Sequence, residues 1–357
     1  MTTQDPSPAP APAPVPAAAS AGSAAAATAT PAKGRGLSVP ETAALMVVLA
    51  ALFIYFSFAS PFFLNQENLV NILQNVSVVG IIACPATLLL ISGQFDLSVG
   101  SGVGFAAMVM AVAALAPGTG GVDLPFALNM TIPSAFIIAV LATLSMGVIN
   151  GFFVTIVGIN ALITTLGTLA IFRGLTKVLG DGQTIRIELF GELGVARFGG
   201  IPLPVYIFIA CVIIFWAILR YTVYGRSLFA IGASPSAARL AGIRTKRVVF
   251  IAFLLSSLCV ALAGLIRLSQ VGGASVNGGL GIELSVVTAV VLGGASLSGG
   301  RGGIFGTVLA VLIVGVLANG LIQLNVPSFW IEVAGGLLLL GAVTVDRIRV
   351  RLTRADN

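Results

Sequence analysis

The sequence contains no histidine, only three cysteines and few charged residues. Without histidine the chain cannot form a Ser-His triad, a His-based zinc site or a His proton relay. It has neither the G-x-x-x-x-G-K-[ST] pattern of a P-loop nor the G-x-G-x-x-G pattern of a dinucleotide site. Cys84, Cys211 and Cys259 fall inside apolar segments without metal-ligand spacing. The sequence therefore predicts no catalytic residues, no metal site and no ATPase site of its own.

The scarcity of charge also excludes a soluble protein. Charged residues make up 8% of the chain, whereas soluble domains carry roughly 25%, and the mean hydropathy is +1.08. The net charge of +6 would suit nucleic acid only if the basic residues gathered on one solvated face, but they lie between apolar runs. The composition predicts an integral membrane protein that contacts lipid and has no nucleic-acid partner.

Long apolar runs dominate the remainder of the chain. A helix needs about 20 mostly apolar residues to cross about 30 Å of hydrocarbon. By this criterion we predict an all-α membrane protein with about ten transmembrane helices, at residues 41–59, 68–92, 97–116, 129–149, 160–179, 204–220, 247–268, 282–298, 303–323 and 328–346. The least certain boundaries are those near residues 92–97 and 282–303.

The basic residues predict the orientation, because short cytoplasmic loops collect Lys and Arg. Three clusters stand before the first predicted span, between the sixth and seventh, and after the tenth. An even number of spans separates each cluster from the next, so all three can lie on the same side. With Arg301 added, 13 of the 18 basic residues would be cytoplasmic, as would both termini.

The two ends differ in composition from the apolar region. We predict a disordered Pro/Ala-rich cytoplasmic tail at residues 1–36, a transmembrane domain at residues 37–346 and a basic cytoplasmic tail at residues 347–357. A secretory signal would place its charge before an apolar run, and residues 1–36 do the reverse, so no cleavage is predicted.

Two short matches indicate an internal repeat. Residues 96–99 (DLSV) and 283–286 (ELSV) open the third and eighth spans, while residues 147–151 (GVING) and 315–320 (GVLANG) close the fourth and ninth. The members of each pair are five spans apart, and because five is odd, matching helices would run in opposite directions. Chance is a rival for matches this short. The pattern predicts two inverted five-helix halves, as found in many transporters.

The longest cytoplasmic connection, residues 221–246, is predicted to contain a short helix. Ser234 suits the N-cap, Pro235 suits the first helical position, and Gly242 can adopt the left-handed conformation that ends a helix. The small side chains of Ala237 and Ala238, together with Ala241, would let another surface approach closely. Arg239 would offer a planar set of donors to a partner carboxylate. We interpret this segment as a docking site, the alternative being an ordinary basic loop.

Several of these segments resemble one family, the membrane permeases of ABC importers for ribose and related monosaccharides. The resemblance covers roughly residues 45–346 and rests on residues 92–100 (SGQFDLSVG), 232–242 (GASPSAARLAG), 165–168 (TLGT), 173–175 (RGL), and 291–296 (VLGGAS) continuing into 299–302 (GGRG). Gln94 and Phe95 replace the Gly and Ile that are commoner in the family, a difference that could reach substrate choice.

The resemblance implies a set of partners and a location. It implies a homodimeric or heterodimeric permease in the bacterial inner (plasma) membrane, a cytoplasmic ATP-binding subunit and a periplasmic sugar-binding protein. ATP would be bound by the partner subunit, with no cofactor in this chain. The family's ATPase docks on the loop that matches residues 232–242, which assigns Gly232 to the coupling set of Ser234, Pro235, Ala237, Ala238, Arg239 and Gly242.

Polar residues inside apolar spans are candidates for the translocation path, because burying them is costly. A neutral sugar needs hydrogen-bonding groups rather than a strong charge. The candidates are Asn71, Asn75, Asp96 and Ser98, although interhelical hydrogen bonding is as good an interpretation of the two asparagines. We interpret Asp96 and Glu283 primarily as caps of the helices that follow them.

The function predicted on this basis is the permease subunit of an ABC importer for a neutral monosaccharide or polyol. A permease for another small solute, such as branched-chain amino acids, and an ion-coupled secondary transporter are the alternatives. A secondary transporter predicts coupling-ion carboxylates at the middle of a span, and none is evident. An intramembrane enzyme would show paired carboxylates or a basic diphosphate site in loops, which the sequence lacks.

Overall fold

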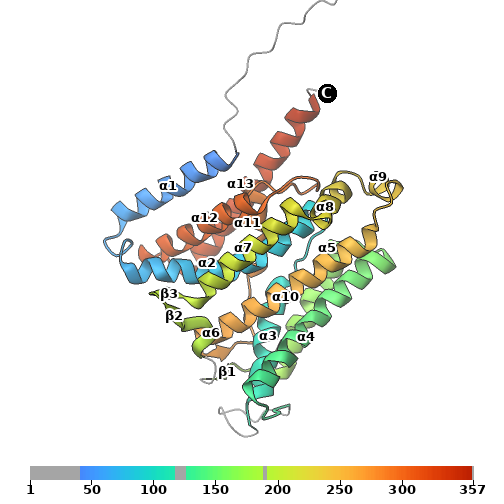
Figure 1. Cartoon of the computed structure of the whole chain (residues 1–357). Coiled ribbons are helices and arrows are strands. Elements are labelled where there is room, and N and C mark those ends of the chain that lie inside the picture. The colour runs from blue at the N-terminus through green and yellow to red at the C-terminus, as the bar shows by residue number, and fades with distance from the viewer. Residues whose placement is uncertain (1–40, 117–125, 188–190, 356–357) are drawn as a thin grey trace, which may run out of the picture. The chain divides into compact units, whose positions relative to one another are not determined.

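Each of the ten predicted spans coincides with a helix in the computed structural model, which describes residues 41–116, 126–187 and 191–355 (Figure 1). Those ten helices are α1 (Glu41–Ala59), α2 (Gln66–Ile91), α3 (Val99–Ala114), α4 (Ile132–Phe152), α5 (Ala161–Leu179), α7 (Leu203–Tyr221), α10 (Thr245–Val271), α11 (Ile282–Leu292), α12 (Ile304–Gln323) and α13 (Ser328–Ala355). Within the described residues, seven helices are long and apolar enough to cross a membrane, and shorter apolar stretches occupy α3, α11 and the first part of α13. The chain is therefore a mostly helical, multi-pass membrane protein.

The remaining elements are short. They are the π-helical turn η1 (Phe153–Val157), the helices α6 (Gly191–Val195), α8 (Val223–Ala233) and α9 (Pro235–Leu240), and the strands β1 (Ile185–Arg186), β2 (Arg197–Phe198), β3 (Ile201–Pro202) and β4 (Gly273–Ala274). The antiparallel pairs are β1 with β4 and β2 with β3. In Figure 1, β1–β3 and α6 lie towards one end of the helices, and α8 and α9 lie towards the other.

Polar residues set the helix boundaries. The Asn65 side chain accepts a hydrogen bond from the Glu67 amide at 3.2 Å at the start of α2. Asn160 accepts one from Leu162 at 2.9 Å at the start of α5. Each cap satisfies an amide that lacks a partner within its helix. Gly272, with φ of +67°, ends α10 in the left-handed conformation.

The eighth predicted span was too long. The apolar run continues to residue 298, but α11 ends at Leu292 because Gly293 and Gly294 follow, the latter with φ of +92°. Residues 293–303 form an irregular connection in which Gly299 and Gly300 also have positive φ. The third span was also shorter than predicted, since α3 begins only at Val99.

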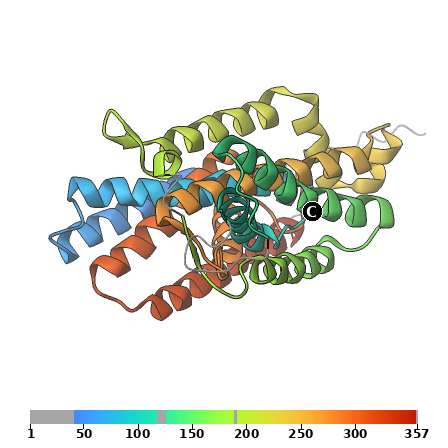
Figure 2. The same cartoon turned by 90° about the horizontal axis from the view of Figure 1, so that it is seen from below.

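The core of the described unit is formed by α2, α3 and α10. Almost every residue of α3 is buried, and α10 packs against α2, α3 and α4. By contrast, α1 exposes most of its apolar side chains, as expected of a helix that faces lipid rather than protein. Figure 2 gives the second view of this arrangement, with α8 and α9 again at the end away from the α1–α2 turn.

The predicted tail at residues 1–36 lies outside the described residues. At the other end, α13 continues past residue 346, the predicted end of the last span, to Ala355.

Candidate docking surface and translocation path

The predicted short helix is present as α9, and both of its predicted ends are correct. Ser234 is the N-cap and its hydroxyl accepts a hydrogen bond from the Ala237 amide at 3.3 Å, with Pro235 at the first helical position. Gly242 adopts φ of +80° two residues after the helix ends, and its amide donates to the Arg239 carbonyl at 3.0 Å. The local sequence alone explains this geometry.

A second helix in the same connection was not predicted. α8 begins after Thr222, whose hydroxyl accepts a hydrogen bond from the Gly225 amide at 3.1 Å. The Tyr224 hydroxyl donates to the carbonyl of Val248 in α10 at 3.0 Å, and burial raises the pKa of Tyr224. The tyrosine therefore remains neutral at physiological pH and fixes α8 to the core. The Thr-cap pattern of residues 222–225 is the signal that could have revealed this helix.

The exposed surface of α9 differs from the predicted alanine face. Ala238 is only 3% exposed, so its side chain packs against this chain and does not form a surface for a partner. Leu240 is 91% exposed and Arg239 and Ala237 are also exposed. The structure thus places Ala238 on the inward face of α9, and the docking role of this segment stays a prediction. Leu240 is an unexpected candidate, because a helix of six residues does not reveal from sequence which face packs inward.

Gly232 brings this helix pair into contact with the core. A Cβ atom at Gly232 would overlap the carbonyl oxygen of Ile91, at the end of α2, and the amide of Gly300, in the connection between α11 and α12. The Gly300 amide donates to the Ile91 carbonyl at 2.8 Å. Three backbone segments therefore meet without intervening side chains, which only glycine permits at position 232.

Asp96 and Ser98 are buried together in a polar network. The Asp96 Oδ1 atom accepts hydrogen bonds from the Ser98 amide at 3.1 Å and from the Ser98 hydroxyl at 2.5 Å. Its Oδ2 atom accepts one from the Ser256 hydroxyl of α10 at 2.9 Å. Ser98 in turn accepts from Asn150 of α4 at 2.9 Å, and Asn150 accepts from Thr168 of α5 at 2.7 Å.

This network ties the segment before α3 to three other helices. Asp96 accepts a hydrogen bond from the amide of Ser98, the N-cap residue, but α3 has no side-chain cap bond, so the interpretation of Asp96 as the cap of α3 is not supported. Each carboxylate oxygen has a partner, and buried polar groups are stable only when they are so paired. Ser256, Asn150 and Thr168 were not predicted, because they lie far from Asp96 in sequence.

The two path candidates on α2 are separated from this network. Asn71 and Asn75 are both exposed, and the Asn75 Oδ1 atom accepts a hydrogen bond from Arg267 of α10 at 3.4 Å. Their neighbour Asn68 is buried and forms reciprocal bonds with Asn319 of α12, at 3.0 and 2.9 Å. Asn75 therefore forms an interhelical bond, as the alternative interpretation predicts, and the part of Asn71 and Asn75 in the translocation path stays a prediction.

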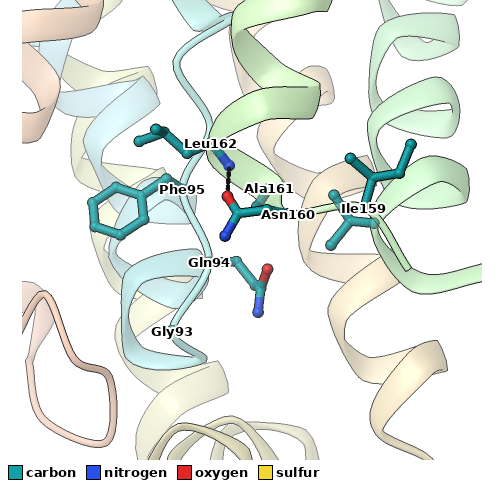
Figure 3. Close-up of a pocket in the computed structure, with 8 residues that line it drawn as sticks. Gly93, Gln94, Phe95, Ile159, Asn160, Ala161 and Leu162 are labelled. Atoms are coloured by element: carbon teal, nitrogen blue, oxygen red, sulfur yellow. Dashed lines mark hydrogen bonds between the residues drawn. The ribbon is translucent and has the colours of Figure 1, made fainter. Parts of the chain in front are cut away.

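A cavity of about 520 Å³ lies beside the segment that leads from α2 to Asp96. It is lined by Gly93, Gln94, Phe95, Val154, Ile159, Asn160, Ala161 and Leu162. In Figure 3, Gln94 belongs to the segment after α2, and its side chain lies near Asn160 at the start of α5. The lining of the cavity thus includes Gln94 and Phe95, the two residues that differ from the commoner family pattern.

These features define a class of protein: a multi-pass membrane protein whose short exposed helices contact the ends of its core helices. A family model described as "Branched-chain amino acid transport system / permease component" matches residues 68–343. The chain belongs to this family of membrane permeases, whose members of known function act in transport. No solved structure matches the chain.

Two relatives of this chain are named as sugar permeases. The chain is 38% identical over 316 residues to the L-arabinose transport system permease protein AraH of Escherichia coli (strain K12), covering 87% of this chain and 92% of the relative. It is 37% identical over 303 residues to the ribose import permease protein RbsC of Bacillus subtilis (strain 168), covering 83% and 89%. Membership of the family identifies the chain as a multi-pass protein of the bacterial inner (plasma) membrane.

Proposed function

We propose that this chain is the permease subunit of an ABC importer for a neutral monosaccharide or polyol. A periplasmic binding protein delivers the solute, a separate cytoplasmic subunit binds ATP, and a second permease copy completes the complex. The family and the arabinose and ribose permeases support the transport class and the sugar. The observation that carries the ATP-driven mechanism is the exposed α9 helix and its direct backbone link to α2 and the α11–α12 connection.

The proposed topology has ten spans, with both termini and α8–α9 on the cytoplasmic side. In Figure 1 the start of α1 and the end of α13 lie towards the same end as α8 and α9. Short helices among the ten are compatible with a span when irregular chain completes the crossing inside the protein. The positive-inside distribution supports the same direction.

The packing of α3 and α11 supports the proposed inverted halves. A shift of five spans pairs α3 with α11, α4 with α12, α5 with α13 and α10 with α2. α3 packs against α4, α5 and α10, and α11 packs against the corresponding α12, α13 and α2. Two similar sets of neighbours around oppositely directed helices are what an inverted repeat produces.

The proposed mechanism is coupling by movement. Closure of the ATPase subunits displaces α9, with Arg239 and Leu240 as the contacts, while Ser234, Pro235 and Gly242 fix the shape of the helix and Ala237 lies on its exposed face. Ala238 anchors α9 to its own chain. The displacement passes through Gly232 to Ile91 and Gly300, and the residues after Ile91 lead to the cavity and to Asp96. Tilting these segments would switch the path between outward and inward access.

A permease for amino acids is the second candidate, favoured by the description of the family model. An amino-acid site would need to hold an ammonium and a carboxylate together, whereas a sugar site needs groups that donate and accept hydrogen bonds and carry no net charge together. Uptake of leucine in place of arabinose or ribose by the reconstituted complex would support this second candidate.

The ATP-driven mechanism is tested by copurification with the ATPase subunit. Leu240→Asp places a charge at the 91% exposed position on α9, and we expect about tenfold less ATPase to copurify with the tagged permease, because interface anchors typically contribute 1 to 2 kcal/mol or more. Leu64→Asp is the matched control, since Leu64 is also exposed but precedes α2. Equal recovery of ATPase with wild type and Leu240→Asp would contradict the docking assignment.

A further inference from the structure

α3 and α11 are too short to cross the hydrocarbon region. With a rise of 1.5 Å per residue, their 16 and 11 residues extend for about 24 and 17 Å, compared with about 30 Å of hydrocarbon. Irregular chain precedes each helix. In transporters, such interrupted helices begin at membrane depth, where their first residues line solute sites. The start of each helix is therefore a place to search for solute contacts.

The starts of these two helices lie close together. A Cβ atom at Gly100, in the first turn of α3, would overlap the Glu283 carboxylate in the first turn of α11. A Cβ atom at Gly279, just before α11, would overlap the Gly100 carbonyl oxygen. Only glycine permits this approach, so the carboxylate lies directly against the backbone of α3.

Glu283 faces Arg173 from α5. The Arg173 Nη2 and Glu283 Oε1 atoms are 3.9 Å apart, and the two side chains are 14% and 13% exposed. The distance is within the range of an ion pair but beyond that of a hydrogen bond. The earlier interpretation of Glu283 as a helix cap is not supported, since α11 has Gly281 at its N-cap and no side-chain cap bond.

Three polar atoms of this pair lack hydrogen-bond partners among the described residues. Among the described residues, neither Arg173 Nη1, Arg173 Nη2 nor Glu283 Oε2 forms a hydrogen bond, although all three are buried. A buried ion pair is stable only when further hydrogen bonds satisfy its remaining donors and acceptors. Each buried group left without a hydrogen bond lowers the stability of the fold. A pair left incomplete at the meeting point of three helices needs a reason.

We propose that Arg173 and Glu283 form the sugar contact of the translocation path. This proposal rests on the proposed function and identifies two residues that would bind the solute. Sugar hydroxyl groups both donate and accept hydrogen bonds, so neighbouring hydroxyls would donate to Glu283 Oε2 and accept from the two Arg173 nitrogens. The sugar itself remains neutral, and the charges of the pair cancel one another.

A cavity gives the sugar room beside Glu283, although Arg173 is not among its lining residues. Glu283 lines a cavity of about 520 Å³ between α11, α12 and α13, and its other polar lining groups include Ser285, Thr288 and Glu332. Most of the cavity surface is apolar, with a few convergent polar groups, as is typical of small-molecule sites. Because the three unpaired atoms are covered by protein, α5 and α11 must move apart for the contact to form, as alternating access requires.

The test is uptake by the reconstituted complex of permease, ATPase and binding protein in proteoliposomes. The probes are radiolabelled L-arabinose and D-ribose, each with a binding protein that holds it. The double variant Arg173→Met/Glu283→Gln removes both charges while preserving side-chain volume, so the protein should fold. We expect the maximal uptake rate to fall about tenfold or more, since the sugar loses its hydrogen bonds to two charged groups. ATP hydrolysis stimulated by the loaded binding protein should change less than twofold.

The dependence of the uptake rate on sugar concentration distinguishes a lost contact with the sugar from a defect in delivery by the binding protein. The binding protein sets the sugar concentration for half-maximal uptake, so this value should be unchanged in the double variant. Retention of wild-type uptake would overturn the proposal. Failure of the double variant to assemble with the ATPase would also overturn it, because the pair would then serve the fold. If wild type transports neither these two sugars nor any other monosaccharide or polyol offered with its binding protein, the proposed function fails rather than this assignment.

Discussion

Asp96 and Glu283 open two similar four-residue segments, 96–99 and 283–286, yet their surroundings differ. Asp96 accepts three hydrogen bonds from Ser98 and Ser256. Glu283 has one distant charge, Arg173, and an unpaired oxygen. The same Asp/Glu-Leu-Ser-Val pattern therefore supports two outcomes. Ser98 of the pattern and Ser256 of α10 donate to Asp96, whereas Ser285 of the pattern donates to the Gly281 carbonyl and Glu283 faces Arg173. A satisfied carboxylate holds a fold together, whereas an unsatisfied one is available to a solute.

The largest expected effect on stability is at Asp96. Asp96→Ala would leave the donors of Ser98 and Ser256 without their acceptor, so we expect the free energy of unfolding to fall by about 3 kcal/mol. The measurement is unfolding of the purified protein by SDS in mixed micelles. Arg173→Met/Glu283→Gln should stay within about 1 kcal/mol of wild type, because replacing both partners of a buried pair is often neutral. Equal losses in the two variants would remove the distinction between the carboxylates.

Asn150 and Asn319 extend the comparison to the second pair of repeat matches. Asn150 connects Ser98 to Thr168, while Asn319 exchanges two bonds with Asn68. Each substitution to Ala should cost about 2 kcal/mol in the same unfolding assay, since each removes two hydrogen bonds of about 1 kcal/mol apiece. Combining Asn150→Ala with Asp96→Ala should cost less than the sum, because both residues belong to one network. If the losses of unfolding free energy for Asn150→Ala and Asp96→Ala simply added in the double variant, the two residues would not belong to one network.

Among the residues of the Asp96 network, Ser256 should show the smallest loss of stability, because it supplies only one of the three bonds to Asp96. We expect Ser256→Ala to lower the free energy of unfolding by about 1 kcal/mol. The matched control is Ser257→Ala, since Ser257 is also buried but donates only to the Leu254 carbonyl in its own helix, at 3.0 Å. Removing such a local bond should cost less than half as much. A larger loss for Ser257→Ala would show that packing, not the bond to Asp96, explains the Ser256 result.

Much of the fold was predictable from the sequence. Apolar runs located each of the ten predicted spans on a helix, and Ser234, Pro235 and Gly242 predicted both ends of α9. The end of α11 was missed because hydropathy treats Gly293 and Gly294 as continuing the apolar run, whereas their backbone conformations end the helix.

The site was less predictable, because it depends on contacts between distant residues. Asp96 meets Ser256 across 160 positions of the sequence, and Arg173 meets Glu283 across 110. No local pattern specifies such a pairing. Likewise, the alanines of α9 indicated a close approach, but only the packing revealed that Ala238 approaches its own chain while Leu240 remains exposed.

The most direct test of the account is the energy source of uptake. Proteoliposomes that contain the permease and its ATPase should accumulate L-arabinose or D-ribose only when ATP is supplied on the side of α8–α9 and a sugar-loaded binding protein on the other. Uptake that needs neither ATP nor the binding protein, but follows an imposed proton gradient, would contradict the account.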